Sequence, residues 1–222
     1  MSFAPLPKVF LEYLEDCNQP SARILDLGCG DGDFFTPLLP LKAQLISLDR
    51  VKPQVGTSPI LVADAKHPPF RPRSMDLIVA ANLFRHILFG EMKADFLENW
   101  CGLLRPGGAL FLFEDEPTVF PPAARNYGQV QDFLLRLLPG ERGPLLARAD
   151  FEGLIGRGTV GSEWVLGLGR NDLKPDLEAI QSLLSSNGVA PGSEVSQLLR
   201  ALDQDGLAYG DFWWACWRAD SA

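Results

Sequence analysis

The chain has 222 residues, a length typical of one domain, and 46% of them are hydrophobic, which is enough to bury a sizeable core. The formal net charge of −8 disfavours a broad phosphate-binding surface for nucleic acid. No apolar run reaches the roughly 18 residues that a membrane span requires, so we expect no membrane partner.

The N-terminal stretch MSFAPLPKVFLEYLEDC carries three acids where a secretion signal would be apolar, which predicts a cytoplasmic protein. The four cysteines lie far apart without a C-x-x-C pair, and the chain has only two histidines. This spacing yields no zinc site, and we expect no metal.

The first half of the chain alternates short apolar runs with helices and turn-rich loops. Apolar residues at helical spacing predict a helix over residues 7–17. Five apolar runs predict strands, at 23–27, 43–49, 59–64, 75–82 and 109–115. Further helices are predicted at 33–40 and 91–104, and loops at 50–59 and 65–74. The order predicts an α/β fold with a doubly wound, mostly parallel Rossmann-like sheet and helices on both faces.

After residue 115 the pattern is less regular. Helices are predicted at 125–138, 144–155, 175–187 and 193–204. Strands are predicted at 162–170 and 207–219, which brings the sheet to about seven strands with the last one antiparallel.

The stretch ILDLGCGDGDFF, residues 24–35, runs from the first predicted strand into a glycine-rich loop. Such loops let the backbone approach a ligand closely, and ligands of open parallel sheets bind at the carboxyl ends of the strands. The dinucleotide fingerprint G-x-G-x-x-G is broken because Asp33 takes the place of its third glycine. Asp31 and Asp33 would also repel a pyrophosphate. A cationic or zwitterionic ligand such as S-adenosylmethionine fits this loop better.

Polar residues also end the next three predicted strands. Asp49 ends the second strand and can accept hydrogen bonds from ribose hydroxyls. Asp64 ends the third strand, where it can accept a bond from an adenine amino group beside the backbone of Ala65. Asn82 ends the fourth. The carboxyl ends of parallel strands share one edge, so these residues and the glycine loop are expected to form one site.

These motifs, together with MDLIVAANLFRHI and LLRPGGALFLFED, resemble those of class I S-adenosylmethionine-dependent methyltransferases, in the same order and spacing, from about Arg23 to Asp115. The resemblance implies a methyltransferase (class EC 2.1.1) that uses S-adenosyl-L-methionine and releases S-adenosyl-L-homocysteine. The length of the chain and the turn-rich stretch at 116–124 predict a single domain with a cofactor-binding half at 1–115, an acceptor-side helical insertion at 116–160, and C-terminal strands and helices at 161–222.

The resemblance also implies the roles of individual residues. The cofactor would be bound by residues of the glycine loop and of the following strand ends, namely Asp26, Gly28, Cys29, Gly30, Asp49, Arg50, Asp64, Ala65, Asn82 and Leu83. His86, one helical turn beyond Asn82, is a candidate proton acceptor, although a histidine satisfied at a helix start explains it as well.

Structural explanations compete with several of these roles. Asp26 can be buried and paired with the backbone, and Asp64 can be a turn acid. Asp31 and Asp33 can favour a helix start. We interpret the acids at 114–116 as a solvated strand end rather than a metal site, and the run FWWACW at 212–217 as a core strand. The arginines of the 116–160 segment are interpreted as surface charges.

The favoured function is methyl transfer to an acceptor that is a small organic molecule, with the chain acting as a monomer or homodimer. Two alternatives remain open at this point. One is a nicotinamide-dependent oxidoreductase, which the missing fingerprint glycine and the loop acids disfavour. The other is a non-catalytic methyltransferase-like binding module, which the intact loop and strand-end acids disfavour.

Overall fold

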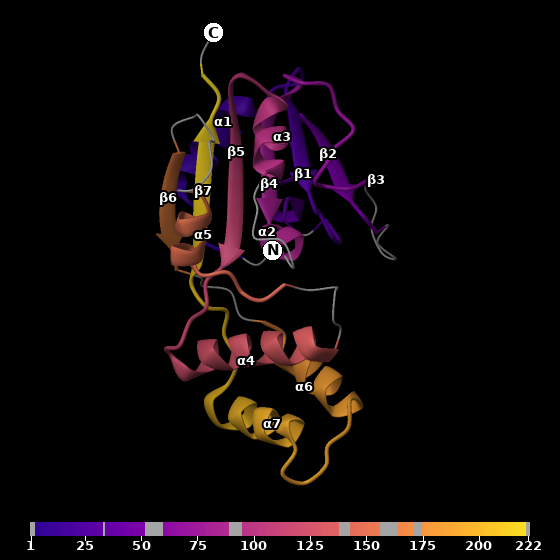
Figure 1. Cartoon of the computed structure of the whole chain (residues 1–222), viewed down its shortest axis with the longest axis vertical. Helices are drawn as coiled ribbons and strands as arrows, with labels where there is room; N and C mark the ends of the chain where they lie inside the picture. The colour runs from indigo at the N-terminus through magenta and orange to yellow at the C-terminus, as the bar shows by residue number, and fades with distance from the viewer. Residues whose placement is uncertain are drawn as a thin grey trace.

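The computed structural model describes residues 3–32, 34–51, 60–88, 95–137, 143–155, 164–170 and 175–220. Within these ranges one seven-stranded sheet has the order β3-β2-β1-β4-β5-β7-β6 (Figure 1). The strands are β1 Arg23–Leu27, β2 Gln44–Asp49, β3 Ile60–Val62, β4 Met75–Ala81, β5 Leu104–Asp115, β6 Trp164–Gly169 and β7 Phe212–Arg218. Strands β1 to β5 pair in parallel, and β7 runs antiparallel to both β5 and β6. The predicted fold class, with its antiparallel last strand, is confirmed.

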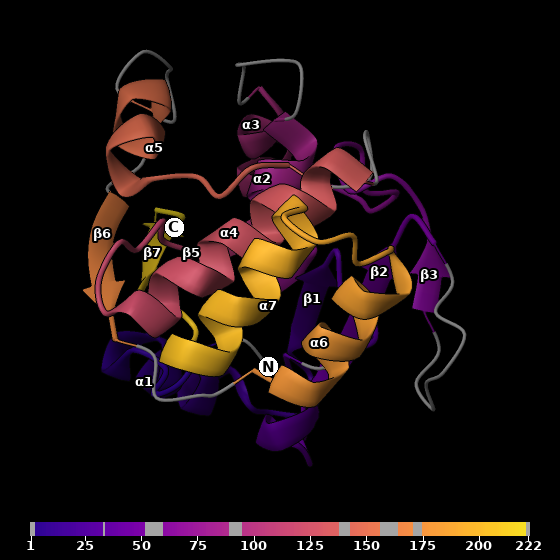
Figure 2. The same cartoon turned by 90° about the horizontal axis from the view of Figure 1, so that it is seen from below.

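Helices cover both faces of the sheet and its carboxyl edge. They are α1 Lys8–Cys17, α2 Phe84–Leu88, α3 Phe96–Gly102, α4 Pro122–Leu137, α5 Arg148–Ile155, α6 Leu177–Ser186 and α7 Glu194–Asp205. Helix α1 lies on one face, whereas α2, α3 and α5 lie on the other. Helices α4, α6 and α7, which we call the helical cap, lie beyond the carboxyl ends of the parallel strands (Figures 1 and 2).

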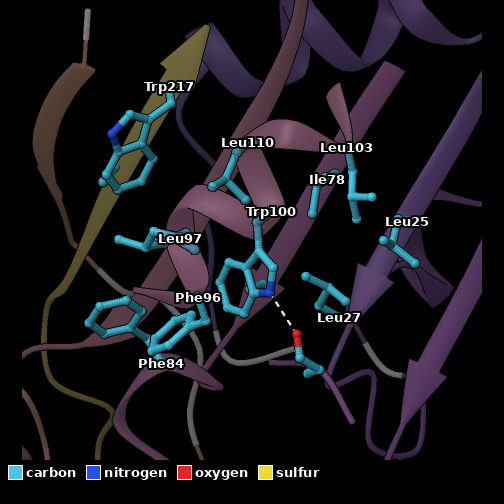
Figure 3. Close-up of a cluster of buried hydrophobic side chains, with 14 of the residues drawn as sticks. Leu25, Leu27, Ile78, Phe84, Phe96, Leu97, Trp100, Leu103, Leu110 and Trp217 are labelled. Carbon is cyan, nitrogen blue, oxygen red and sulfur yellow. Dashed lines mark hydrogen bonds between the residues drawn. The ribbon is translucent and has the colours of Figure 1, made fainter. Parts of the chain in front are cut away.

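The central strands are apolar on both sides because both faces of the sheet are covered. On the face of α3, Leu25, Ile78 and Leu110 pack around Trp100, which is fully buried (Figure 3). The Trp100 indole Nε1 donates a 2.6 Å hydrogen bond to the carbonyl of Ala65, the dashed line in Figure 3. A buried indole needs such a partner, and this bond fixes the chain just after β3.

The opposite face is built from aromatic rings. Phe10 of α1 meets Phe111 and Phe113 of β5 edge-to-face, with ring centroids 5.1 and 5.2 Å apart. Phe34, from the loop after β1, lies 5.3 Å from Phe113. Edge-to-face ring pairs add to the hydrophobic gain. Together these ring contacts hold α1 and the loop after β1 against the same strand, β5.

The helical cap has a small core of its own. Val130 and Leu134 of α4 pack with Leu184 of α6 and with Leu198 and Leu202 of α7. Side-chain hydrogen bonds start two of these helices, because Asp176 accepts from Ala179 N and Ser193 accepts from Ser196 N.

The loop after β1 differs from the expectation. Residues 33–40 were predicted to be helical, but the described part contains only a single 3-10 turn, Thr36–Leu38 (η1). Pro37 and Pro40 account for this, since proline donates no backbone hydrogen bond. Helix α2 contains His86, in agreement with the helix start that was expected near this residue. Predictions for residues 52–59 and 91–94 lie outside the described residues.

The segment 116–160 is divided between two parts of the molecule. Helix α4 packs with α6 and α7 in the cap. Helix α5 instead packs on the sheet, where Phe151 stacks on Trp213 with centroids 4.4 Å apart. The predicted domain limits, including an acceptor-side role for residues 116–160, remain a hypothesis; the structure places α4 of this segment in the cap and α5 on the sheet.

Candidate cofactor site

A cavity of about 320 Å³ opens where β1 and β4 end. It is lined by Phe3, Asp26, Gly28, Cys29, Gly30, Asp31, Phe34, Ala81, Asn82 and Tyr209. Half of these residues belong to the predicted cofactor set. The structure therefore brings the first and fourth strand ends together, as the sequence predicted.

The glycine-rich turn forms the floor of this cavity. Gly28, Gly30 and Gly32 have φ angles of +66°, +53° and +82°, in the left-handed region that favours glycine. The backbone N–H groups of Gly28 and Cys29 both donate to the Leu48 carbonyl of β2, at 2.8 and 3.1 Å. The turn is thus held to the neighbouring strand, while nothing lies within 4 Å of a Cβ built on Gly30.

Asp49 holds the turn from the end of β2. Its Oδ2 accepts from Gly30 N at 2.9 Å, and its Oδ1 accepts from Val51 N at 3.0 Å. Each carboxylate oxygen retains acceptor capacity after one such bond. Because Asp49 is only half-buried, this capacity remains accessible to a ligand hydroxyl.

Asp26 is buried at the cavity, and one of its carboxylate oxygens accepts no hydrogen bond from the described residues. Its side chain is 1% exposed, and its Oδ2 has no hydrogen-bond partner among the described residues. Burial, reinforced by the negative charge of Asp49, raises the pKa of Asp26 to about 7. The expectation that a backbone group might satisfy this carboxylate does not account for Oδ2. A cation at this position would supply the missing partner.

The third strand end is organised as a turn. Asp64 Oδ1 accepts from Lys66 N at 2.9 Å, and the Asp64 carbonyl accepts from His67 N at 3.1 Å. Ala65 is buried beneath this turn and tied to Trp100. Neither Asp64 nor Ala65 lines the cavity, so an adenine role for them remains a prediction.

Asn82 connects the cavity to β5. It adopts a left-handed φ of +52°, and its Oδ1 accepts from Asp115 N at 3.2 Å. Asparagine tolerates this backbone region better than most residues. The side chain is thereby oriented at the cavity edge by a backbone bond from the neighbouring strand.

Two of the acids at 114–116, Glu114 and Asp115, are buried, so their interpretation as a solvated strand end was wrong, whereas Glu116 is half-buried. Glu114 is fully buried; its Oε1 accepts from Phe84 N at 2.6 Å, and its Oε2 lies 3.9 Å from Arg85 Nε. Burial raises the pKa of Glu114 to about 7, although Arg85 opposes the shift. Asp115 is 1% exposed and accepts from the Tyr127 hydroxyl of α4 at 3.1 Å. The cap covers this strand end, which the local pattern did not reveal.

The remaining predicted residues lie around the cavity rather than in its lining. Leu83 packs on the turn, since a Cβ on Gly28 would lie 2.5 Å from its Cδ1. Arg50 is exposed just after β2. His86 is half-buried in α2, and its Nδ1 accepts from Gly143 N at 3.0 Å. The catalytic role suggested for His86 therefore gains no support from its placement.

Sequence reasoning missed the aromatic part of the cavity. Phe3 precedes the first helix, and Tyr209 precedes β7, so neither adjoins a recognised motif. Phe34 lay in a segment predicted as helix. No periodicity or motif in the chain marks these three rings as neighbours.

The cavity has the chemistry of a cation site. Asp26 and Asp31 contribute carboxylates, the turn contributes backbone that a ligand can approach closely, and none of the described lining residues is basic. Burial raises the pKa of the Cys29 thiol to about 12, so it stays protonated. Among the described residues no cluster of three or more metal-ligating side chains occurs.

Residues 25–112 match the family model described as "Methyltransferase domain". This range extends from β1 to β5 and includes the glycine turn, Asp49 and Asn82. Over these residues, which are less than half of its length, the chain is similar to methyltransferase domains.

Two curated proteins similar to part of this chain are named for quinone biosynthesis. The human mitochondrial ubiquinone biosynthesis O-methyltransferase is 32% identical over 108 residues, which cover 40% of this chain and 28% of that enzyme. A ubiquinone/menaquinone biosynthesis C-methyltransferase of Vibrio vulnificus is 27% identical over 146 residues, covering 58% of this chain and 55% of the relative. The chain therefore spans less than two thirds of these relatives.

Solved structures of low sequence identity share the fold of this chain. A putative methyltransferase from Bacillus halodurans superposes with a TM-score of 0.54, at 15% identity, over 97% of this chain and all of the other. A cyclopropane-fatty-acyl-phospholipid synthase-like protein from Lactobacillus casei reaches a TM-score of 0.61 at 14% identity, covering 94% and 89% of the two chains. Within the described ranges, every helix is too short or too polar to cross a bilayer.

Proposed function

We propose that this protein is an S-adenosyl-L-methionine-dependent methyltransferase that acts on a small organic acceptor. The observation that carries the proposal is the buried Asp26 carboxylate, whose Oδ2 has no hydrogen-bond partner among the described residues and which lines the same cavity as the left-handed glycine turn. The match of residues 25–112 to methyltransferase domains supports the same conclusion.

The residues of the cavity suit this cofactor and do not suit a dinucleotide. An ammonium group beside Asp26 would fill the open acceptor position on Oδ2. Ribose hydroxyls would donate to Asp49, which keeps accessible acceptor capacity at the next strand end. A pyrophosphate at the same turn would meet Asp26 and Asp31 without a compensating basic group in the lining.

The protein contributes binding and orientation, while the bound cofactor supplies an electrophilic methyl group on a sulfonium. Asp26 would hold the ammonium group of the cofactor and Asp49 its ribose, and Asn82 is held at the cavity edge by Asp115 N. Alignment of an acceptor with the methyl group supplies most of the rate enhancement in such a transfer. The cavity needs no general base when the acceptor is already nucleophilic, and His86 is not required.

A small, apolar acceptor is supported by the relatives named for quinone biosynthesis and by the net charge of −8, which disfavours nucleic acid. A reducing compartment such as the cytoplasm is supported by the four cysteines, all of which are free thiols. A monomer or homodimer remains the proposed assembly.

Calorimetry with S-adenosyl-L-homocysteine tests the cofactor. Wild-type protein should bind it, and Asp49→Ala should weaken binding about tenfold or more through loss of charge-assisted hydrogen bonds. Asp220→Ala is the matched control, because Asp220 is exposed beyond β7 and the change in net charge is the same. Absence of binding by the wild type at high micromolar concentration would exclude the proposal.

The alternatives predict different results. A nicotinamide-dependent oxidoreductase would be stabilised against heat by NAD and not by S-adenosyl-L-homocysteine. A non-catalytic module would bind the cofactor but transfer no methyl group to any member of a panel of phenolic and quinol acceptors.

A further inference from the structure

Aromatic rings share the cavity with the acids. Phe3 and Phe34 line it while remaining 1% and 6% exposed, because they belong mainly to the core on the α1 face. Tyr209 also lines it but is only half-buried. Of the three rings, Tyr209 therefore retains the side-chain surface that a bound molecule can cover.

A buried network fixes the position of the Tyr209 ring. The ring meets Tyr127 of α4 edge-to-face, with centroids 4.9 Å apart and planes at 70°. The Tyr127 hydroxyl donates to Asp115 Oδ2 at 3.1 Å. Burial raises the pKa of Tyr127, so the hydroxyl keeps its proton and remains a donor. Through Tyr127, the ring of Tyr209 is held in a fixed position relative to the end of β5.

The backbone around Tyr209 is equally constrained. Two segments that join the sheet to the cap run side by side, 116–123 and 206–211. Ala208 N donates to the Ala123 carbonyl at 3.1 Å, and Glu116 N donates to the Asp211 carbonyl at 2.9 Å. A Cβ on Gly210 would lie 2.4 Å from Thr118 Oγ1, so the two segments are in close contact. The backbone of Tyr209 is therefore held by hydrogen bonds on both sides, at Ala208 and at Asp211.

We infer that Tyr209 is a specificity-determining residue that places its aromatic ring against the positive charge of the bound cofactor, so that the site prefers the sulfonium over its neutral thioether product. The inference rests on the proposed function. An aromatic face attracts a cation through the ring quadrupole, and the attraction increases when water is excluded. The product carries no sulfonium charge, so loss of the ring should affect the two ligands unequally.

The preference for the sulfonium would affect how fast the product is exchanged for fresh cofactor. Carboxylates and a fixed ring in one cavity stabilise the cation before transfer, and the ring's contribution disappears once the methyl group has left. This arrangement favours exchange of product for fresh cofactor. It also assigns a role to the helical cap, which holds the ring through Tyr127.

The test is calorimetry with S-adenosyl-L-methionine and S-adenosyl-L-homocysteine on wild type, Tyr209→Phe and Tyr209→Leu. Tyr209→Leu should lose about 2- to 30-fold in affinity for the sulfonium form, the range expected for one cation–π contact, and less than about twofold for the thioether. Tyr209→Phe keeps the ring and should keep the wild-type ratio of affinities. Val189→Ala, an exposed change in the cap, is the control.

Equal losses for both ligands, or no loss in Tyr209→Leu, would overturn the inference while leaving the proposed function intact. A wild type that binds both ligands equally well would also overturn it, and this measurement does not depend on how the variants fold. A wild type that binds neither ligand would instead refute the proposed function.

Discussion

Replacing Asp26 with asparagine and titrating S-adenosyl-L-homocysteine binding against pH tests the cofactor site through one carboxyl group. In the free protein the pKa of Asp26 is raised to about 7 by burial and by Asp49. An ammonium on Oδ2 favours the charged carboxylate, so binding at low pH must first remove a proton. Affinity should therefore increase as pH rises through the free-state pKa.

The magnitude follows from the fraction of ionised protein. With a pKa of about 7, about 90% of Asp26 is ionised at pH 8 and about 10% at pH 6, so the apparent affinity should fall about tenfold between them. Asp26→Asn cannot form the charged contact, and its affinity at pH 8 should be about 10- to 100-fold lower, the range for a hydrogen bond to a charged group. Its affinity should also be flat from pH 6 to 8.

Isothermal titration calorimetry at half-unit pH steps measures these slopes. Asp220→Asn removes the same charge from an exposed site and should retain the wild-type slope. A flat wild-type profile would refute the reasoning. A slope that persists in Asp26→Asn would assign the titration to another group, for which Glu114, with a pKa of about 7, is the first candidate.

Three further outcomes concern stability. Folding raises the pKa of Asp26 from 3.8 to about 7, so ionisation of this carboxyl opposes folding increasingly as pH rises from about 4 to 7. Asp26→Asn should therefore raise the free energy of unfolding at pH 8 by about 1 kcal/mol or more. Urea midpoints at pH 4 and pH 8 would show whether this gain is confined to high pH. Gly28→Ala should destabilise the protein by about 2 kcal/mol, because the new Cβ adds left-handed backbone strain and a 2.5 Å contact with Leu83. Gly192→Ala, at a φ of +78° with open space around the Cβ, should cost only about 1 kcal/mol. Equal urea midpoints for the two variants would show that the contact with Leu83 contributes nothing. Trp100→Phe should lower the free energy of unfolding by about 2–3 kcal/mol, because it removes the 2.6 Å hydrogen bond to the Ala65 carbonyl and leaves a void in the core. An unchanged thermal midpoint would show that the indole does not stabilise the core.

Features written in local sequence were predictable. Apolar runs such as residues 23–27 and 75–82 indicated buried strands, because a strand covered on both faces needs apolar side chains throughout. The glycine turn was recognisable because left-handed backbone at Gly28 and Gly30 favours this residue. Asn82 was expected at the site because parallel strand ends meet at one edge, whereas Asp26 was expected from the family resemblance; both line the cavity.

Features that depend on distant partners were not predictable. Helical spacing at 33–40 suggested a helix, but the prolines and the packing of Phe34 against Phe113 left only one 3-10 turn. Glu114 and Asp115 look like an ordinary polar strand end until α2 and the helical cap cover them. Charge and polarity predict exposure only where nothing packs above the residue.

The amino-acid sequence by itself determined the sheet, the glycine turn and the acids that favour a cationic cofactor, because each follows from neighbours along the chain. Only the tertiary structure decided which side chains complete the cavity. Phe3 and Tyr209 lie near opposite ends of the sequence, yet both line it. Their meeting depends on the order in which strands pair and on where the cap closes over the strand ends, and no local pattern encodes that convergence.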